Sequence, residues 1–480
     1  MYNISKQLNN NSVDYKEPMD KILLGVSYAA IIDTELYESP ELEIQSGQQL
    51  QQQSRLVVVS GRTQRIVANV LDKGFGDRKA DDEFRTLLDN AFKGKSRTNG
   101  SNRVDDDLWR GFAVFTKTTD GNRFQQISRH IARQLAQNKP SIWFMISGLR
   151  PYIWNSVLAL MTIPAFKASV ETSAQMLSPL GVDGIECLTE TIDWKRELNE
   201  HNIHRAFIAA AVHHMAFMDA MRVVGVTPDG YLGSSLGELM CLYLDGLCDR
   251  RQFLAMCSAV RPPVSDGRPP VYGFLIGQSW PEIQRLCQGR TDIYPAEHIA
   301  HNLCGIGGNE ALVRELHREL CARGVETRKV SREPDPFHTE YMFEPNIGAA
   351  LVAQFTKVVP ERTHRLPTNG WLSSSRPTLR EVSTSDGCFS LAECFANILL
   401  SPVLFNEAVD RLPAEALVLN IATDCKLRSV ALTGRVQERY VKEEVSTSQP
   451  VFGINHLLRE IGLVFTAGHW PRIHDLMASV

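Results

Sequence analysis

The sequence lacks the features that mark proteins of membranes, nucleic acids and secretion. Its formal net charge is -4, and no basic stripe predicts a nucleic-acid surface. The longest apolar stretch, residues 206–226, is interrupted by two histidines, an aspartate and an arginine, so it favours a buried helix over a membrane span. The N-terminus is polar and rich in asparagine, without the pattern of a signal peptide.

Cysteine pairs at C-x-x-C spacing are also absent, although the sequence holds ten cysteines. Scattered thiols in a large chain are typical of a reducing compartment, so we expect a cytoplasmic protein with no bound metal. Small buried side chains are the plainest interpretation of these cysteines.

What is present is enough apolar sequence for a large core. The chain has 480 residues, 43% of them hydrophobic, and such a length predicts roughly two to four domains or subdomains. A Gln-rich run at residues 45–54 has the composition of a linker. From residue 141, an apolar strand, helices and a strand–turn–helix unit follow one another, which favours an α/β layer fold. Residues 263–330 show the order β-α-β-α-β, as expected for a small inserted subdomain.

The main chemical signal is the pentapeptide Gly233-Ser234-Ser235-Leu236-Gly237, which has the form G-x-S-x-G. In the nucleophile elbow of this form, the serine lies on a tight strand-to-helix turn that glycines permit. Ser235 would be the nucleophile, and the backbone N–H of Leu236 would be one donor of an oxyanion hole. A glycine-rich turn with a solvated serine has the same pattern.

A serine nucleophile needs a base, and spacing alone does not choose one among thirteen histidines. His338 lies in the segment DPFHTEYM. A lone histidine beside an aromatic residue also fits a purely structural role.

Several ordered segments resemble the malonyl/acetyl transferase region of animal-type, insect-like fatty acid synthases. Residues 230–248 are similar to the active-site segment, and FHTEYM at residues 337–342 is similar to the block that holds the family's catalytic histidine. SPVLFNEAVDRLPAEALVLNIA, residues 401–422, is the most similar segment. LVVVSGRT and RGFAVF resemble the linker domain that precedes the transferase. The resemblance extends over about residues 55–475.

The resemblance implies an α/β-hydrolase-like acyltransferase core with an inserted ferredoxin-like α+β subdomain, preceded by a small α+β linker domain. The expected boundaries are 1–54 for a disordered segment or remnant of a condensing domain with its linker, 55–140 for the linker domain, 141–262 and 332–440 for the core, 263–331 for the subdomain, and 441–480 for a final helix and tail.

The resemblance also implies ping-pong acyl transfer. His338 would deprotonate Ser235, which would take an acetyl or malonyl group from acyl-CoA and pass it to the phosphopantetheine thiol of an acyl carrier domain. A backbone carbonyl, by position that of Leu404, would orient the histidine. Partners would be acyl-CoA, the carrier and other synthase domains, and no cofactor would be bound permanently.

Four positions depart from the family pattern, and two of them lie near the expected oxyanion hole. Ser234 stands where the family has histidine. The loop Gly-x-Gly-Ser-Gln reads Gly148-Leu149-Arg150-Pro151-Tyr152, so Tyr152 would supply the second oxyanion N–H. Pro151 restricts the backbone of that loop.

The other two departures concern substrate binding. The arginine that pairs with the malonyl carboxylate falls on Val260, with Arg261 next to it as the candidate substitute. The later Pro-His-Ala reads Thr423-Asp424-Cys425. The chain is therefore expected to be an active acyltransferase with altered substrate choice. The alternatives are a degenerate domain kept as a scaffold or partner-binding module, and an unrelated serine hydrolase or thioesterase.

Overall fold

The protein is described here from a computed structural model. It describes residues 26–34, 53–72, 109–117, 124–133, 139–149, 153–189, 203–261, 271–333, 337–339, 345–360, 362–363, 367–375, 389–422, 427, 432 and 453–478.

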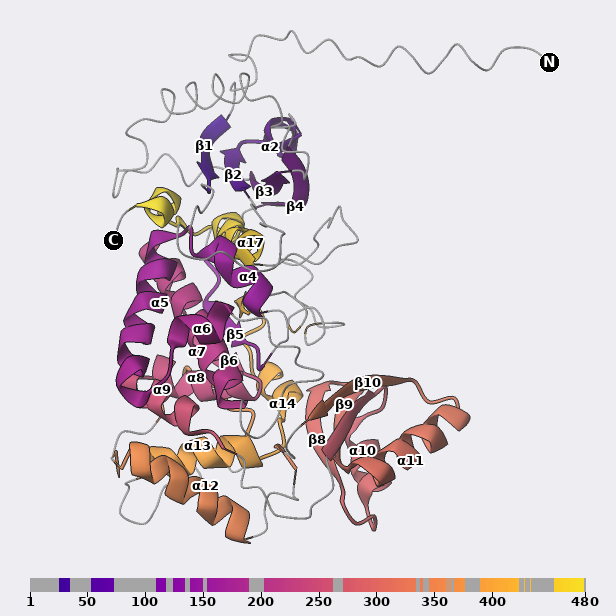
Figure 1. Cartoon of the computed structure of the whole chain (residues 1–480). Helices are drawn as coiled ribbons and strands as arrows, with labels where there is room; N and C mark the ends of the chain where they lie inside the picture. Colours follow the sequence, from indigo (N-terminus) through magenta and orange to yellow (C-terminus); the bar gives the residue numbers. More distant parts are fainter. Residues whose placement is uncertain are drawn as a thin grey trace, which may run out of the picture.

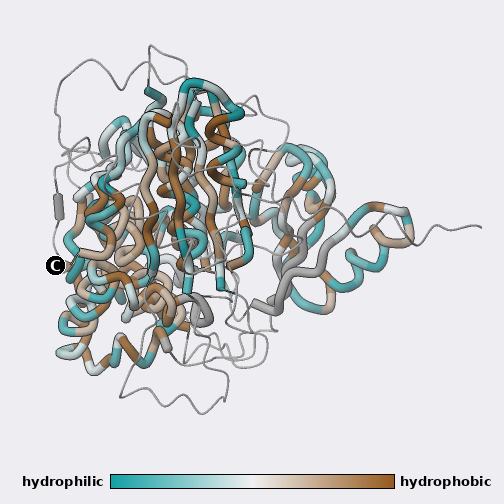
Figure 2. Tube along the Cα trace, turned by 90° about the horizontal axis from the view of Figure 1, so that it is seen from above, coloured by the Kyte–Doolittle hydropathy of each residue, from teal (hydrophilic) through white to brown (hydrophobic). Residues whose placement is uncertain are grey.

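The N-terminal part is a four-stranded antiparallel sheet with strand order β1-β2-β3-β4. Its elements are β1 (Val26–Asp33), β2 (Ser54–Gly61), α2 (Gln64–Leu71), β3 (Trp109–Lys117) and β4 (Phe124–Arg133). All eight residues of β2 are buried, because α2 covers one face of the sheet and the C-terminal helix α17 (Gly453–Thr466) covers the other (Figure 1). Seen from above, hydrophobic stretches run along the strands (Figure 2).

Strand β1 corrects the domain boundary expected at residue 55. It pairs with β2 from Val26 to Asp33 and so belongs to the same sheet. The Gln-rich run therefore lies between two paired strands, and its low complexity does not mark the edge of a domain.

The core is built on a parallel sheet with strand order β13-β5-β6. Its strands are β5 (Ile142–Ile146), β6 (Gly230–Gly233) and β13 (Leu417–Ile421). Every residue in them is buried, which explains why β5 appears as a continuous apolar run in the sequence. The helices around the sheet are α4 (Ile153–Leu160), α5 (Pro164–Leu177), α6 (Gly184–Thr189), α7 (Ile203–Val223), α8 (Leu236–Leu244), α9 (Arg250–Ala259), α12 (Pro345–Val358), α13 (Leu391–Leu400) and α14 (Phe405–Val409).

Helix α7 is the apolar stretch that the sequence predicts to be a buried helix, and it is one. It packs against α5, α6 and α9 and exposes almost none of its surface. No helix in the part of the chain that the structure describes is long and apolar enough to cross a bilayer. Short elements complete the body: β11 (Arg362–Thr363), β12 (Phe389–Ser390) and the 3-10 helices η2 (Ser178–Leu180) and η4 (Ile473–Met477).

A smaller unit projects from one side of the core (Figure 1). It consists of β7 (Val271–Ile276), α10 (Trp280–Cys287), β8 (Ile293–Ala300), β9 (Leu303–Asn309), α11 (Glu310–Ala322) and β10 (Thr327–Glu333). The sheet is antiparallel with strand order β10-β7-β9-β8. The expected order β-α-β-α-β misses one strand, because the stretch around His301 is the turn between β8 and β9.

The cysteines in the described ranges are all free, and all but Cys321 are buried. They therefore behave as small core side chains.

Candidate active site

Ser235 lies in the sharp turn between strand β6 and helix α8. The strand ends at Gly233, the helix begins at Leu236, and Ser235 between them has φ 57° and ψ −121°. A side-chain-bearing residue in such a conformation costs about 1–3 kcal/mol, so the surrounding structure must hold it there. Part of that support is the N–H of Ser234, which donates to the Ile146 carbonyl at 3.0 Å.

The glycines of the pentapeptide are required by close backbone contacts. A Cβ on Gly233 would lie 2.1 Å from the carbonyl carbon of Gly237, and one on Gly237 would lie 2.1 Å from the Ile146 carbonyl oxygen. Gly148, after β5, has the same role, because its Cβ would lie 3.1 Å from that of Ser235. Strand, turn and helix are thus packed together as in a nucleophile elbow.

His338 reaches Ser235 across 103 residues of sequence, with 2.8 Å between its Nε2 and the serine Oγ. Its Nδ1 lies 2.9 Å from the Ser401 carbonyl oxygen. A carbonyl only accepts hydrogen bonds, so Nδ1 carries the proton and Nε2 offers its lone pair to the serine hydroxyl. This is the tautomer that a general base requires.

The carbonyl that orients the histidine belongs to Ser401, so the expected assignment to Leu404 is wrong. Leu404 is the N-cap of α14, and its carbonyl accepts the N–H of Ala408 at 3.3 Å. Its N–H donates to the Ser374 carbonyl at 2.7 Å. The resemblance identified the correct segment, but the start of a short helix directs the Leu404 carbonyl along the helix axis.

Burial keeps His338 uncharged. The residue is 6% exposed, has φ 65°, and donates its backbone N–H to the Leu399 carbonyl at 2.9 Å. Burial lowers the pKa of His338 to about 4, against the opposing effect of its hydrogen bond to Ser401. At neutral pH the imidazole is therefore a free base, ready to accept a proton.

A buried hydrogen-bond cluster around Glu238, which the sequence did not predict, stabilises the elbow. Glu238 in α8 is 2% exposed and accepts hydrogen bonds from three consecutive serines, Ser373, Ser374 and Ser375. Burial raises the pKa of Glu238, and the serine hydrogen bonds lower it. The Ser374 hydroxyl also lies 2.8 Å from the Gly233 carbonyl oxygen, so the cluster joins the strand and the helix on both sides of Ser235. The three serines in a row were the available signal, but only the fold shows that they meet Glu238.

Leu236, whose N–H is one expected oxyanion donor, lies directly after Ser235. Leu236 is the first residue of α8, so its N–H has no partner within the helix. No acceptor for it is found among the residues that the structure describes. The second expected donor, Tyr152, lies outside the described residues, which end at Leu149 in that loop.

Arg261 has a different partner from the expected one. Its Nη1 lies 2.9 Å from both the Ser258 and the Val260 carbonyl oxygens, at the C-terminal end of α9. An arginine in this position caps its own helix. Val260 is fully buried in the main core. The role of Arg261 in binding a substrate carboxylate finds no support in this geometry.

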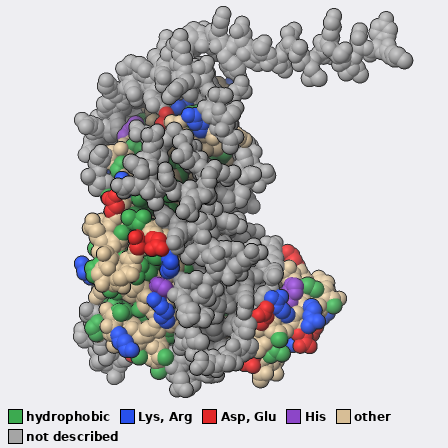
Figure 3. Space-filling view, in the orientation of Figure 1, with side chains coloured by type: hydrophobic (Ala, Val, Ile, Leu, Met, Phe, Trp, Pro, Cys, Tyr) green, Lys and Arg blue, Asp and Glu red, His purple; other side chains and the backbone are tan. Residues whose placement is uncertain are grey.

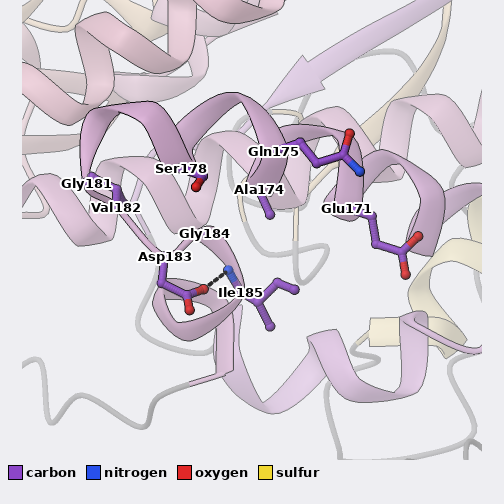
Figure 4. Close-up of a pocket in the computed structure, with 9 residues that line it drawn as sticks. All are labelled: Glu171, Ala174, Gln175, Ser178, Gly181, Val182, Asp183, Gly184 and Ile185. Atoms are coloured by element: carbon purple, nitrogen blue, oxygen red, sulfur yellow. Dashed lines mark hydrogen bonds between the residues drawn. The ribbon is translucent and has the colours of Figure 1, made fainter.

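An open pocket of about 500 Å³ lies between α5 and α6, and neither Ser235 nor His338 lines it (Figure 4). Asp183 in this pocket accepts hydrogen bonds from the backbone N–H groups of Ile185 and Glu186, so its carboxylate stabilises the start of α6.

Within the described ranges, no group of histidine, cysteine and acidic side chains is arranged to hold a metal.

Comparison with known proteins identifies the family of this chain. A family model described as an acyl transferase domain matches residues 157–448, more than half of the chain. A highly reducing polyketide synthase of Gibberella zeae is 24% identical over 299 residues, which cover 60% of this chain and 12% of that synthase. A hybrid PKS-NRPS synthetase of Dothistroma septosporum is 26% identical over 207 residues, 41% of this chain and 5% of the synthetase. The chain thus spans a small part of the length of these relatives.

Two solved structures have a similar fold. The acyl transferase domain of ZmaA has a TM-score of 0.61 at 15% identity, over 88% of this chain and 95% of that one. The acyltransferase domain from module 8 of the salinomycin polyketide synthase has a TM-score of 0.61 at 13% identity, over 87% and 97%. These relatives point to the polyketide synthase and fatty acid synthase type in general, and the finer animal-type assignment stays a hypothesis. Since the family match extends over the elbow serine and its histidine, this chain belongs to the acyl transferase domain family.

Proposed function

We propose that this chain moves an acyl group from CoA to the phosphopantetheine thiol of an acyl carrier domain through an acyl-serine. The hydrogen-bonded series from Ser235 through His338 to the Ser401 carbonyl carries this proposal. It combines a nucleophile, a neutral base and an acceptor that fixes the tautomer of that base.

The first half-reaction loads the serine. His338 Nε2 takes the hydroxyl proton of Ser235 as Oγ attacks the thioester carbonyl, and the resulting oxyanion faces the N–H of Leu236. The tetrahedral intermediate collapses, its C–S bond breaks, and the leaving CoA sulfur takes the proton back from His338, so that CoA departs as a thiol and the histidine is neutral again.

The second half-reaction reverses these steps with a new thiol. His338 takes the proton of the carrier phosphopantetheine thiol, and the sulfur attacks the acyl-serine carbonyl. The ester bond breaks and Ser235 recovers its proton from His338. A histidine that is neutral between steps fits both directions of transfer.

We further propose that a neutral acyl group such as acetyl is preferred to malonyl. A carboxylate buried without a cationic partner costs several kcal/mol. Val260 occupies the arginine position of the family pattern, and Arg261 caps α9. Malonyl should therefore be accepted poorly.

The setting that we propose is a fatty acid synthase of animal type, working in the cytoplasm with carrier and other synthase domains. The linker-like segments at residues 56–63 and 110–115 support it, since residues 56–61 and 110–115 lie in the paired strands β2 and β3 ahead of the core. The antiparallel order β10-β7-β9-β8 supports a ferredoxin-like subdomain. The free, mostly buried cysteines of the described ranges are compatible with a reducing compartment.

A degenerate scaffold is the second candidate, favoured by the altered oxyanion loop at residues 148–152 and by Thr423-Asp424-Cys425. Mass spectrometry of the intact chain after incubation with acetyl-CoA or malonyl-CoA separates the two functions. Wild type should gain one acyl group, and Ser235→Ala should gain none. An unmodified wild type would favour the scaffold, and steady release of free acid without a carrier would favour a hydrolase.

A competition experiment tests the selectivity. With both CoA esters present, wild type should be labelled mainly by acetyl, and Val260→Arg should shift labelling towards malonyl. A wild type that strongly prefers malonyl, and loses this preference in Arg261→Ala, would contradict the proposal.

A further inference from the structure

The four residues that follow α13 connect the histidine to the inserted subdomain. Ser401 supplies the carbonyl that accepts the His338 Nδ1–H, at 2.9 Å. Two residues later, Val403 donates its N–H to the Ala296 carbonyl at 2.9 Å and accepts the N–H of His298 at 2.8 Å. These two bonds form a parallel bridge along the free edge of β8, the outermost strand of the subdomain sheet.

A side-chain pair spans the same junction. His298 of β8 is 8% exposed, and its Nδ1 lies 2.9 Å from Oε1 of Glu407 in α14. The imidazole stacks on the Trp280 indole of α10, with 5.4 Å between ring centroids and 9° between ring planes. The core helix α14, the subdomain sheet and the subdomain helix α10 therefore meet at one histidine.

The subdomain also touches the other side of the catalytic loop. Thr339 follows His338 directly, and its Cγ2 would lie 3.1 Å from a Cβ placed on Gly307 of β9. The subdomain sheet thus contacts the chain that carries the catalytic imidazole and the chain that orients it. A shift of this sheet would move both chains.

We propose that His298 and Glu407 are positioning residues for His338, because they dock the inserted subdomain onto residues 401–404 and so fix the Ser401 carbonyl. Only two backbone hydrogen bonds join Val403 to β8, and the partly buried hydrogen bond between His298 and Glu407 adds a directional contact at the same junction. The inference rests on the proposed function for the catalytic role of His338. Misplacing a catalytic group by 1 Å costs roughly 100-fold in rate, so loosened docking should be visible in acyl transfer.

The test compares His298→Ala and Glu407→Ala with two further variants. His298→Asn keeps an N–H near the position of Nδ1, whereas His298→Gln places its amide nearer the position of Nε2. The control is Arg314→Ala, which breaks the exposed Glu310–Arg314 pair on α11 of the same subdomain. Charges of both signs are interspersed over this outer surface (Figure 3).

Two readouts are combined. Hydrogen exchange of peptides that contain Val403 and His298 reports docking, with peptides of β9 as an internal reference for subdomain integrity. The rate constant and KM of acyl-serine formation report whether His338 is correctly positioned against Ser235. Both alanine variants should exchange faster at the junction but not in β9, and acylation should slow by about ten-fold or more at an unchanged KM. His298→Asn should recover protection and rate better than His298→Gln, and Arg314→Ala should resemble wild type.

Faster junction exchange with an unchanged acylation rate would overturn the coupling, and so would unchanged exchange in both alanine variants. A wild type that forms no acyl-serine would instead refute the proposed function. In that case no acylation rate can be measured, and the downfield Nδ1–H proton resonance of His338 serves as the readout of its hydrogen bond to Ser401. Its loss in His298→Ala but not in Arg314→Ala would still support the coupling, and its persistence would refute it.

Discussion

At the scale of single residues, the protonation state of His338 decides whether it can accept the proton of Ser235, its hydrogen-bond partner. The ring is buried, its Nδ1 donates to a carbonyl, and no carboxylate stabilises its charged form among the contacts that the structure describes. A buried imidazole without a carboxylate partner resists protonation. Dyads of this kind therefore keep their base at a pH where a solvated histidine is half charged.

This gives a pH prediction for acyl-serine formation. Burial lowers the pKa of His338 to about 4, and only the neutral form accepts the serine proton. The rate should therefore hold as the pH falls through 6.5 and should drop only near pH 4. The measurement is the acylation rate against pH, with circular dichroism at each pH to confirm that the chain stays folded. Half-maximal rate near pH 6.5 in a folded chain would mean that His338 is solvated.

At the scale of elements, the elbow is held by close contacts between backbones and by a buried cluster of side-chain hydrogen bonds. Gly237 in α8 faces the end of β5, and Glu238 one residue later is fastened by Ser373, Ser374 and Ser375. The strain at Ser235 is thus balanced by tight packing on one side and by a buried hydrogen-bond cluster on the other.

Gly237→Ala tests this packing. The added Cβ would lie 2.1 Å from the Ile146 carbonyl oxygen, so strand and helix must separate, and we expect a loss of about 3 kcal/mol or more in the free energy of unfolding. The control is Gly348→Ala in α12, where the nearest atom, on Leu400, lies at 3.5 Å. There alanine should be neutral or stabilise by about 0.5–1 kcal/mol. Urea denaturation measures both values, and equal effects would contradict a special constraint at the elbow.

At the scale of the whole molecule, Arg110 joins the N-terminal sheet to the end of the chain. It lies on β3, is fully buried, and donates through Nη1 to the carbonyls of Phe465 and His469 at 3.1 and 2.8 Å. Its guanidinium carbon lies 4.2 Å from the centroid of the Trp470 ring. Helix α17 therefore packs against both the N-terminal sheet and the core, although the sequence indicated only a final helix and tail.

Arg110→Ala should cost about 2 kcal/mol or more, because it removes the Arg110 donor from the His469 carbonyl, removes one of two donors to the Phe465 carbonyl, and loses the contact with the Trp470 ring. Arg129→Ala is the matched control on the same sheet, since it removes a more exposed pair with Asp72, and should cost at most about 1 kcal/mol. Thermal unfolding and limited proteolysis between the sheet and the core give the readout. Equal stability of the two variants would show that Arg110 does not hold the sheet to the C-terminal helix.

The sequence alone was sufficient to single out Ser235 and His338, which the structure brings within 2.8 Å of each other, and to predict a separate inserted unit. His338 was identified through the resemblance of its segment to the histidine block of the family, because spacing alone does not choose among thirteen histidines. Ser235 and the inserted unit depend on local order, namely a glycine-flanked serine between strand and helix and a run of alternating strands and helices. Such features survive in one dimension because turns and amphipathic periods are set by neighbouring residues.

Only the tertiary structure decided which atoms meet. The orienting carbonyl is that of Ser401 rather than Leu404. The Ser401 carbonyl lies just after α13 and accepts the His338 Nδ1–H, whereas the Leu404 carbonyl lies at the start of α14 and accepts the N–H of Ala408. Arg261 donates to carbonyls at the end of its own helix α9. Strand β1 pairs with β2, although the Gln-rich run separates the two strands in the sequence. The contact of His298 with Glu407 spans 109 residues. A hydrogen bond depends on position within about an ångström, and chain segments far apart in sequence reach that precision only when the core packs.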